Sequence, residues 1–167
     1  RQTLCPDKIR GVVEYRHVSF RYPGGDGDVL SDISFTALPG QITAFIGATG
    51  SGKSTLVNLL PRFYDVTGGE ILIDGVNIKD WPLHKLRQNL GFVPQKGVLF
   101  SGTIRSNLAY GDRTAGEEQI ERSARTAQAM EFIESKPDLF DTLIAQGGGN
   151  VSGGQKQRLS IARALVK

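Results

Sequence analysis

The chain has 167 residues, of which 39% are hydrophobic, 22% charged and 8% aromatic, as in an ordinary globular domain with one core. This composition argues against disorder, the single Cys5 excludes a disulfide framework, and no apolar run is long enough to span a bilayer. The formal net charge of +3 is compatible with anionic ligands, although it does not by itself indicate nucleic acid. Glycine is unusually abundant, at 21 residues, which predicts places where the backbone turns sharply or approaches a ligand.

The first part of the chain favours strands. Val, Tyr and Phe residues over 11–20 predict a strand that the loop at 23–27 ends, and a second short strand is expected over 33–37. Residues 41–46 are nearly all apolar or β-branched, which is typical of a strand covered on both faces. We therefore expect this third strand to be buried.

Glycines end that run, and a helix is expected from Lys53 until Pro61. Residues 70–73 and 76–78 flank the pair Asp74-Gly75, which is typical of a β-hairpin with a type I′ turn. A helix over 82–90 and a strand over 90–93 are expected next.

The second half favours helices. Thr114 and Glu117 have the spacing of a capping box that opens a polar helix, and this helix and its neighbour are expected to run to about Lys136. Ser152 and Gln155 have the same spacing at the start of the last helix. The apolar residues expected to face the core from these helices are Ile120, Ala124, Ala127, Leu159, Ala162, Leu165 and Val166. Alternating strands and helices around a glycine loop indicate the α/β class, with a mainly helical insert at about 96–146.

A phosphate-binding motif lies between the third strand and the first helix. The pattern G-x-x-x-x-G-K-[ST] is matched in full by Gly47, Ala48, Thr49, Gly50, Ser51, Gly52, Lys53 and Ser54. Glycines let successive N–H groups of such a loop point at phosphate, and the following helix begins with free N–H groups. Lys53 supplies charge to the β and γ phosphates, and the Ser54 hydroxyl is placed to bind Mg²⁺. The alternative is a glycine-rich turn that binds nothing.

A second motif selects among the classes of phosphate-loop protein. Val151-Ser152-Gly153-Gly154-Gln155, followed by residues 156–165, resembles the signature of ATP-binding cassette (ABC) domains, with Val where Leu is usual. Tyr22 resembles the adenine-stacking aromatic of that family, and Gln95 after residues 92–94 resembles its Q-loop glutamine. Residues 99–108 are similar to the stretch that follows in exporter-type cassettes. Alternatively, Tyr22 packs on its own sheet, Gln95 simply ends a strand, and the signature is a plain helix cap.

The resemblance covers residues 11–167 and implies an α/β fold: a P-loop NTPase core with an N-terminal antiparallel β subdomain and a helical insert, ABC ATPase-like and incomplete. It divides one truncated nucleotide-binding domain into a linker from a membrane domain (1–10), a β subdomain and P-loop core (11–95), a helical subdomain (96–150) and the signature helix (151–167). We expect a piece of a longer protein, because the sequence begins without Met and stops within a helical pattern.

The resemblance also implies ATP and Mg²⁺ as ligands. The residues implied to bind ATP are Tyr22, Gly47, Ala48, Thr49, Gly50, Ser51, Gly52, Lys53, Ser54 and Thr55. Ser54 and Gln95 are implied to bind Mg²⁺. Ser152, Gly153, Gly154 and Gln155 are implied to act in trans on the ATP of a partner domain, because the phosphates of the same chain already lie in the first loop.

The implied function is that of an ATP-binding and hydrolysing domain of an exporter on the cytoplasmic face of the cell membrane. Its expected partners are a second nucleotide-binding domain, as a homodimer or heterodimer, and the transmembrane domains of the same transporter, without nucleic acid. Segments outside this sequence would specify the transported substrate.

The Asp-Glu pair that supplies the hydrolytic base in this family does not occur here. Gln95 is therefore the one residue here that is implied to assist hydrolysis. Asp74 follows an apolar run as the aspartate of the Asp-Glu pair does, but the hairpin explains it better. The base is expected in the parent protein. A nucleotide-gated module without hydrolysis stays an alternative, whereas an ABC ATPase of DNA repair would need a long coiled-coil insertion that is missing.

Overall fold

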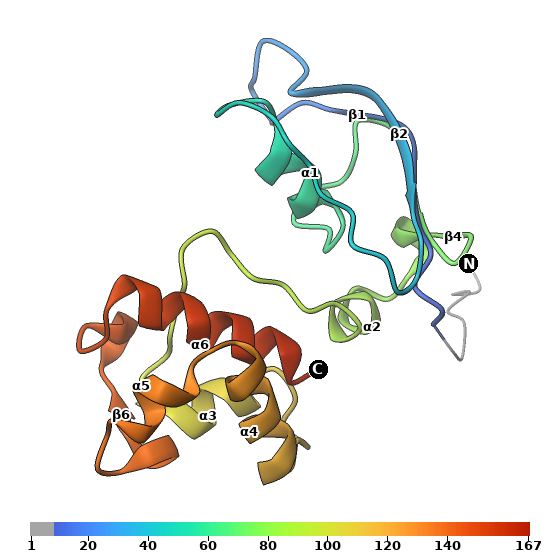
Figure 1. Ribbon diagram of the computed structural model, residues 1–167. Helices are drawn as coiled ribbons and strands as arrows, with labels where there is room; N and C mark the ends of the chain where they lie inside the picture. Colours follow the sequence, from blue (N-terminus) through green and yellow to red (C-terminus); the bar gives the residue numbers. More distant parts are fainter. Residues whose placement is uncertain (1–8) are drawn as a thin grey trace. The chain divides into compact units, whose positions relative to one another are not determined.

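The computed structural model describes residues 9–167, so most of the predicted linker at 1–10 lies outside the described residues. The chain divides into two compact units, the first ending at Arg87 and the second spanning Gln88–Lys167 (Figure 1). The first contains an antiparallel sheet and short helices, and the second is mainly helical. The mixed α/β class expected from the sequence is confirmed.

The first unit is built on a four-stranded antiparallel sheet in the order β2-β1-β3-β4. Its strands are β1 (Val13–Phe20), β2 (Leu30–Ala37), β3 (Gly68–Ile73) and β4 (Val76–Asn77). These elements confirm the strands predicted at 11–20 and 33–37 and the hairpin after residue 70. The pairing of β1 with β2 shifts register between Tyr15 and Val18, where His17 has a φ of 50°. This bulge keeps Tyr15, Val18 and Phe20 on the buried side of the sheet.

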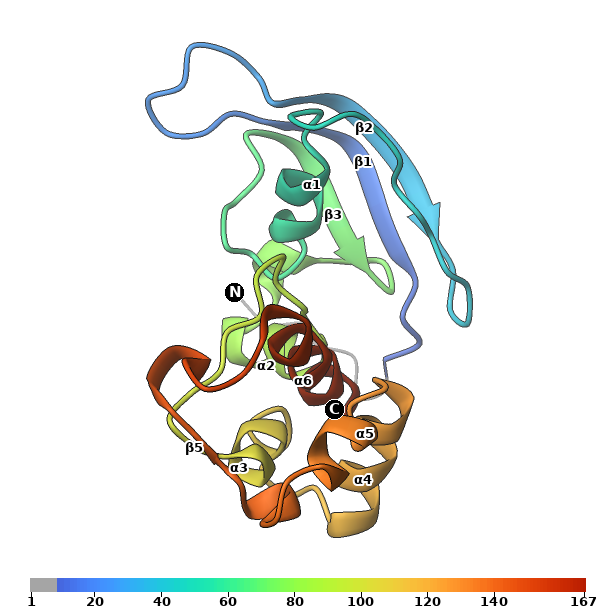
Figure 2. The ribbon, with the colours of Figure 1, turned by 60° about the vertical axis from the view of Figure 1, so that its left-hand side comes forward.

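Helix α1 (Lys53–Leu59) packs beside this sheet (Figure 2). It buries Leu56 and Leu59, and the Tyr15 hydroxyl donates a hydrogen bond of 2.9 Å to the carbonyl oxygen of Leu56. Burial raises the pKa of Tyr15, so this donor stays protonated at neutral pH. The first unit is completed by the 3₁₀ turn η1 (Ile78–Asp80) and by α2 (Leu83–Gln88), which lies within the predicted span 82–90.

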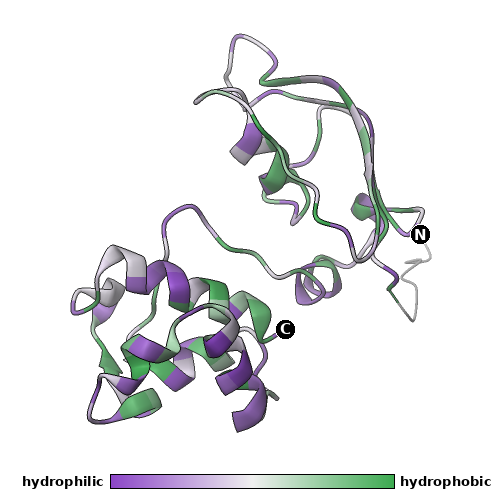
Figure 3. Ribbon diagram, in the orientation of Figure 1, coloured by the Kyte–Doolittle hydropathy of each residue, from purple (hydrophilic) through white to green (hydrophobic). Residues whose placement is uncertain are grey.

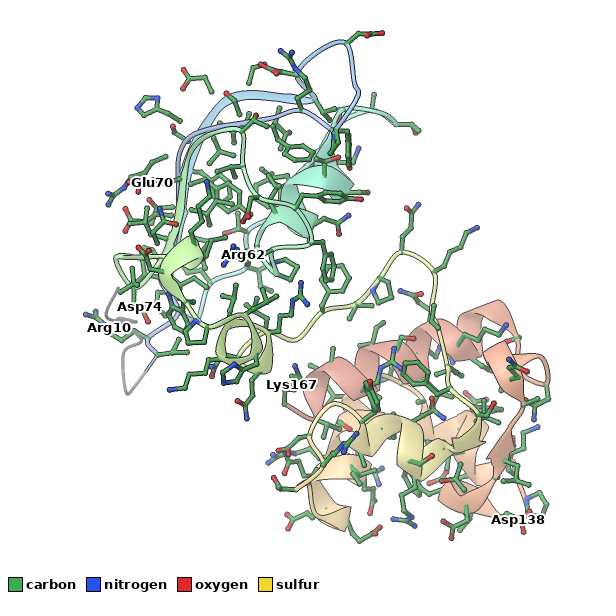
Figure 4. The ribbon with its side chains drawn as sticks, turned by 180° about the vertical axis from the view of Figure 1, so that it is seen from behind. Arg10, Arg62, Glu70, Asp74, Asp138 and Lys167 are labelled. Atoms are coloured by element: carbon green, nitrogen blue, oxygen red, sulfur yellow. The ribbon has the colours of Figure 1, made fainter. Side chains whose placement is uncertain are left out.

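The hairpin turn has the predicted left-handed residues, with φ of 52° at Asp74 and 79° at Gly75. The Asp74 carboxylate accepts hydrogen bonds from the backbone N–H groups of Arg10 (2.6 Å), Gly11 (3.0 Å) and Val12 (2.8 Å) (Figure 4). Partial burial raises the pKa of Asp74, but these hydrogen bonds and the Arg10 charge outweigh it and hold the pKa below its ordinary value. Asp74 therefore fastens the chain entering β1 to the β3–β4 turn.

The second unit encloses its own hydrophobic core. Its elements are β5 (Gly102–Thr103), α3 (Ile104–Ala109), α4 (Glu117–Thr126), α5 (Met130–Glu134), η2 (Leu139–Asp141), β6 (Leu143–Ile144), η3 (Gln146–Gly148) and α6 (Gly153–Leu165). Hydrophilic residues dominate α4 in Figure 3, yet Ile120 and Ala124 are buried as predicted. From α6, the predicted Leu159, Ala162 and Val166 join the same core.

Four local predictions are wrong. Residues 41–46 and 90–93 form no strand, and Ile42 and Ile46 are 98% and 97% exposed, because no described strand pairs with these extended segments. Thr114 does not cap α4, because Gly116 occupies the N-cap position and the helix has no side-chain cap; the Thr114 hydroxyl donates to the Asp112 carboxylate at 2.7 Å. Leu165 is 46% exposed, at the edge of the α6 stripe. No helix in residues 9–167 is long and apolar enough to cross a membrane.

We expect Asp74→Asn to lower the free energy of unfolding by about 1–3 kcal/mol near pH 7, because an amide cannot replace a carboxylate that accepts several N–H groups. The pKa of Asp74 is lower in the folded protein than in the unfolded chain, where it is about 3.9. The ionised carboxylate therefore stabilises the fold fully above a pH of about 3.9, and this stabilisation is lost as the pH falls through the folded-state pKa. Denaturant unfolding at several pH values measures the difference. The difference in unfolding free energy should shrink in acid. The control is Asp26→Asn in the exposed 23–27 loop. A difference for Asp74→Asn that persists at about pH 2 would contradict this account.

Candidate functional site

The phosphate loop, residues 47–54, is shaped by two glycines with left-handed backbone. The φ angles of Gly50 and Gly52 are 82° and 91°, and the N–H of Ser51 donates to the carbonyl oxygen of Ala48 at 3.2 Å to close a turn. Gly52 is also crowded, because a Cβ there would lie 2.9 Å from Leu30 Cδ2 and 3.1 Å from the carbonyl oxygen of Val29. A Cβ here would require the Leu30 side chain and the Val29 carbonyl to shift, and the positive φ also favours glycine.

Lys53 points its charge back into the loop that precedes it. Its Nζ donates to the carbonyl oxygens of Gly47 (2.6 Å) and Ala48 (2.7 Å) and to Ser51 Oγ (3.2 Å). The loop therefore curls around an ammonium group instead of extending away from it. These carbonyl oxygens are neutral acceptors, so a charged phosphate oxygen can compete with them for the ammonium group.

The structure brings Tyr22 to the start of α1, although the two are far apart in the sequence. The Tyr22 hydroxyl and Thr55 Oγ1 are 2.9 Å apart and share a hydrogen bond. The Tyr22 ring packs almost perpendicular to the rings of Phe20 (4.8 Å between centroids) and Tyr64 (5.1 Å). Sequence patterns did not single out Tyr64 or the Thr55 contact, because neither has a local signal.

The remaining residues of the loop are accessible. Ala48, Thr49, Gly50 and Ser54 are exposed, whereas Thr55 is buried. The Ser54 hydroxyl forms no hydrogen bond within residues 9–167, so its oxygen is available to a ligand. Gly47 is constrained, because a Cβ there would lie 2.6 Å from Ser51 Oγ.

The signature segment begins α6 in the second unit. Ser152 Oγ accepts the N–H of Gln155 (3.2 Å), and the Gln155 side chain accepts the N–H of Ser152 (2.9 Å), which confirms the predicted capping box. Ser152, Gly153 and Gly154 are exposed, and a Cβ on either glycine would meet nothing within 4 Å. As an acceptor in the cap, the Ser152 hydroxyl keeps its proton for an external acceptor.

Gln95 lies in a segment that packs along α6 within the same unit. Its side chain is exposed, but Gln157 Nε2 donates to the carbonyl oxygen of Pro94 at 3.5 Å. A Cβ at Gly97 would lie 2.7 Å from the backbone carbonyl of Lys156. The chain around Gln95 is thus held against the signature helix, a contact that the sequence did not reveal.

Comparison with known proteins gives consistent matches. Residues 30–167 match the family described as "ABC transporter". The chain is 51% identical over 166 residues to an ATP-dependent lipid A-core flippase of Pseudomonas aeruginosa, covering 99% of this chain and 28% of the relative. It is 48% identical over 161 residues to an uncharacterized ABC transporter ATP-binding protein of Bacillus subtilis, covering 96% of this chain and 28% of that protein.

Among solved structures, a bacterial Atm1-family ABC exporter with ATP bound superposes with a TM-score of 0.89 at 41% identity, covering 98% of this chain and 28% of that chain. The chain therefore spans about 28% of the length of these relatives.

We expect Gly52→Ala to destabilise the protein more than Gly50→Ala. Each alanine adopts an unfavourable left-handed conformation at a cost of about 1–2 kcal/mol, but only the Cβ at residue 52 also collides with Leu30 and Val29. Denaturant unfolding without nucleotide measures both losses. Equal losses would mean that the loop relaxes away from β2.

Proposed function

Because the chain belongs to the ABC transporter family, we propose that it is the ATP-binding and ATP-hydrolysing domain of an exporter. In this proposal two such domains associate head to tail around ATP and so drive the export of a substrate across a membrane. The observation that carries it is the curled phosphate loop, with Lys53 Nζ held by the carbonyl oxygens of Gly47 and Ala48. The alignment with an ATP-bound exporter supports it.

The residues of the phosphate loop fit a nucleotide triphosphate. On binding, Lys53 exchanges its carbonyl partners for phosphate oxygens, which are stronger acceptors because they are charged. The left-handed glycines leave the loop N–H groups unshielded by side chains on that side. The proposed ATP-binding residues are Tyr22, Gly47, Ala48, Thr49, Gly50, Ser51, Gly52, Lys53, Ser54 and Thr55.

Ser54 and Gln95 suit Mg²⁺, because hydroxyl and amide oxygens are ligands that this ion accepts. The Ser54 hydroxyl is exposed in the first turn of α1, and the Gln95 side chain is exposed in the second unit. When bound, the ion neutralises charge on the β and γ phosphates. Gln95 is proposed to assist hydrolysis, and the base is proposed to belong to the longer protein.

Tyr22 is proposed to stack on the adenine ring, a contact worth about 1–3 kcal/mol per base. Its aromatic neighbours Phe20 and Tyr64 pack against the ring and restrain it. A restrained ring loses little freedom when a base stacks on it, which favours binding.

The signature residues Ser152, Gly153, Gly154 and Gln155 are proposed to contact the γ-phosphate held by a partner domain. The exposure of Ser152, Gly153 and Gly154 supports this role, as does the space beside both glycines. The partners in this proposal are a second nucleotide-binding domain and the transmembrane domains of the same transporter, with this domain on the cytoplasmic face of the membrane.

We expect Lys53→Ala to weaken ATP binding by about ten- to a hundredfold, because hydrogen bonds to charged groups contribute about 1.5–3 kcal/mol each. Titration with a fluorescent ATP analogue in the purified full-length protein measures the affinity. Lys79→Ala, an exposed lysine of the same unit, is the matched control. Unchanged affinity in Lys53→Ala would refute the assignment of the phosphate loop.

We expect Ser152→Ala to leave ATP affinity of the monomeric protein unchanged and to reduce ATP-dependent dimerisation and hydrolysis, because the hydroxyl serves the partner's nucleotide. Light scattering and phosphate release measure the two effects. Thr103→Ala removes a capping box of the same kind from α3, so it controls for the loss of helix stability, about 0.5–2 kcal/mol. If the monomeric Ser152→Ala variant lost ATP binding, the signature would instead act on the nucleotide of its own chain.

A further inference from the structure

One contact in the first unit joins the proposed base end of the ATP site to the helix that begins at its phosphate end. Tyr22, the proposed platform for the base, follows β1, and Thr55 lies in the first turn of α1, next to Ser54. Their hydroxyl groups are 2.9 Å apart across a separation of 33 residues. Among the described residues, this is the only hydrogen bond of the Tyr22 side chain.

We propose that the hydroxyl pair of Tyr22 and Thr55 sets the spacing between the base platform and the phosphate loop, with Thr55 acting as a positioning residue through Tyr22. The inference rests on the proposed function and extends it. The phosphates are held by α1 and the loop before it, whereas the base is held by the chain after β1. A ligand that joins both parts is bound best when their spacing is already fixed, because no freedom is lost in aligning them.

The surroundings of the pair make it a defined restraint. Thr55 is 7% exposed and Phe20 is 2% exposed, so these two partners of Tyr22 belong to the packed interior of the first unit, whereas Tyr64 is 41% exposed. Phe20 and Tyr64 contact the ring almost at right angles, with interplanar angles of 83° and 87°. Packing fixes the ring laterally, and the hydroxyl bond fixes the distance of its tip from α1.

The chemistry of the pair also separates it from direct phosphate binding. Both groups are neutral hydroxyls, and each can donate and accept. Either hydroxyl can be the donor, but Thr55 is buried, and among the described residues Tyr22 is the only hydrogen-bond partner of its hydroxyl. Thr55 therefore acts on the base through Tyr22, and its removal should affect ligands with a base while sparing ligands that consist of phosphates alone.

The test compares ATP with inorganic tripolyphosphate in the purified full-length protein. The variants are Tyr22→Phe, Thr55→Val and the double variant, which remove the hydroxyls and keep most of the volume. We expect each single variant to lose about three- to tenfold in ATP affinity, as for one neutral hydrogen bond, with unchanged affinity for tripolyphosphate. The double variant should lose no more than either single variant, because both remove the same bond.

Two controls isolate the hydroxyl bond. Thr55→Ser keeps the hydroxyl and should retain ATP affinity, and Tyr110→Phe removes a tyrosine hydroxyl in the second unit and should have no effect. Thermal unfolding identifies any variant that fails to fold. If Thr55→Val does not fold, the ratio of ATP to tripolyphosphate affinity in Tyr22→Phe decides the question alone.

Additive losses in the double variant, or an equal loss of tripolyphosphate affinity in Thr55→Val, would overturn the inference, because Thr55 would then bind phosphate independently of Tyr22. Unchanged ATP affinity in both single variants would overturn it as well. Failure of the proposed function gives a different result, since the unmodified protein would then bind neither ATP nor tripolyphosphate.

Discussion

Gly52 holds a φ angle of 91° directly beside the first residue of β2, and three side chains of the proposed nucleotide site depend on this constraint. The left-handed residue ends the loop and begins α1, so it determines the direction in which Lys53 and Ser54 leave the helix. It also places Thr55 within reach of the Tyr22 hydroxyl. Because a Cβ at residue 52 would crowd Leu30 and Val29, the same glycine permits both the packing against the sheet and the geometry of the phosphate loop.

The two ends of the proposed nucleotide site are held by different forces. At the phosphate end, the Lys53 ammonium is bound by backbone carbonyl oxygens that a more strongly charged acceptor can replace. At the base end, neutral hydroxyls and perpendicular aromatic rings hold Tyr22. Salt screens the first kind of interaction and leaves the second largely unaffected. In the proposed site, affinity for phosphate and recognition of the base therefore rest on physically separate contacts within one unit.

Sequence patterns predicted the features whose partners lie within a few residues of one another. The Asp74-Gly75 turn and the Ser152–Gln155 capping box are of this kind, and both have the expected geometry. The strand predicted at 41–46 is wrong because burial of an apolar run depends on neighbours from elsewhere, and Ile42 has none among the described residues. The cap predicted at Thr114 is wrong because the N-cap position of the helix falls on Gly116 instead. The contact of Tyr22 with Thr55 spans 33 residues, a distance at which no local pattern carries information.

The glycines of the second unit differ in how much space a Cβ would have at each position. Gly97 and Gly111 are fixed by internal packing, because a Cβ would lie 2.7 Å and 2.1 Å from backbone atoms of α6. Gly153 and Gly154 have open space at the same position, although glycine within a helix costs about 1 kcal/mol relative to alanine. Nothing within the described chain offsets that cost. The open space at the start of α6 leaves room for a group from outside the unit, and this is where the proposed function puts the partner's γ-phosphate.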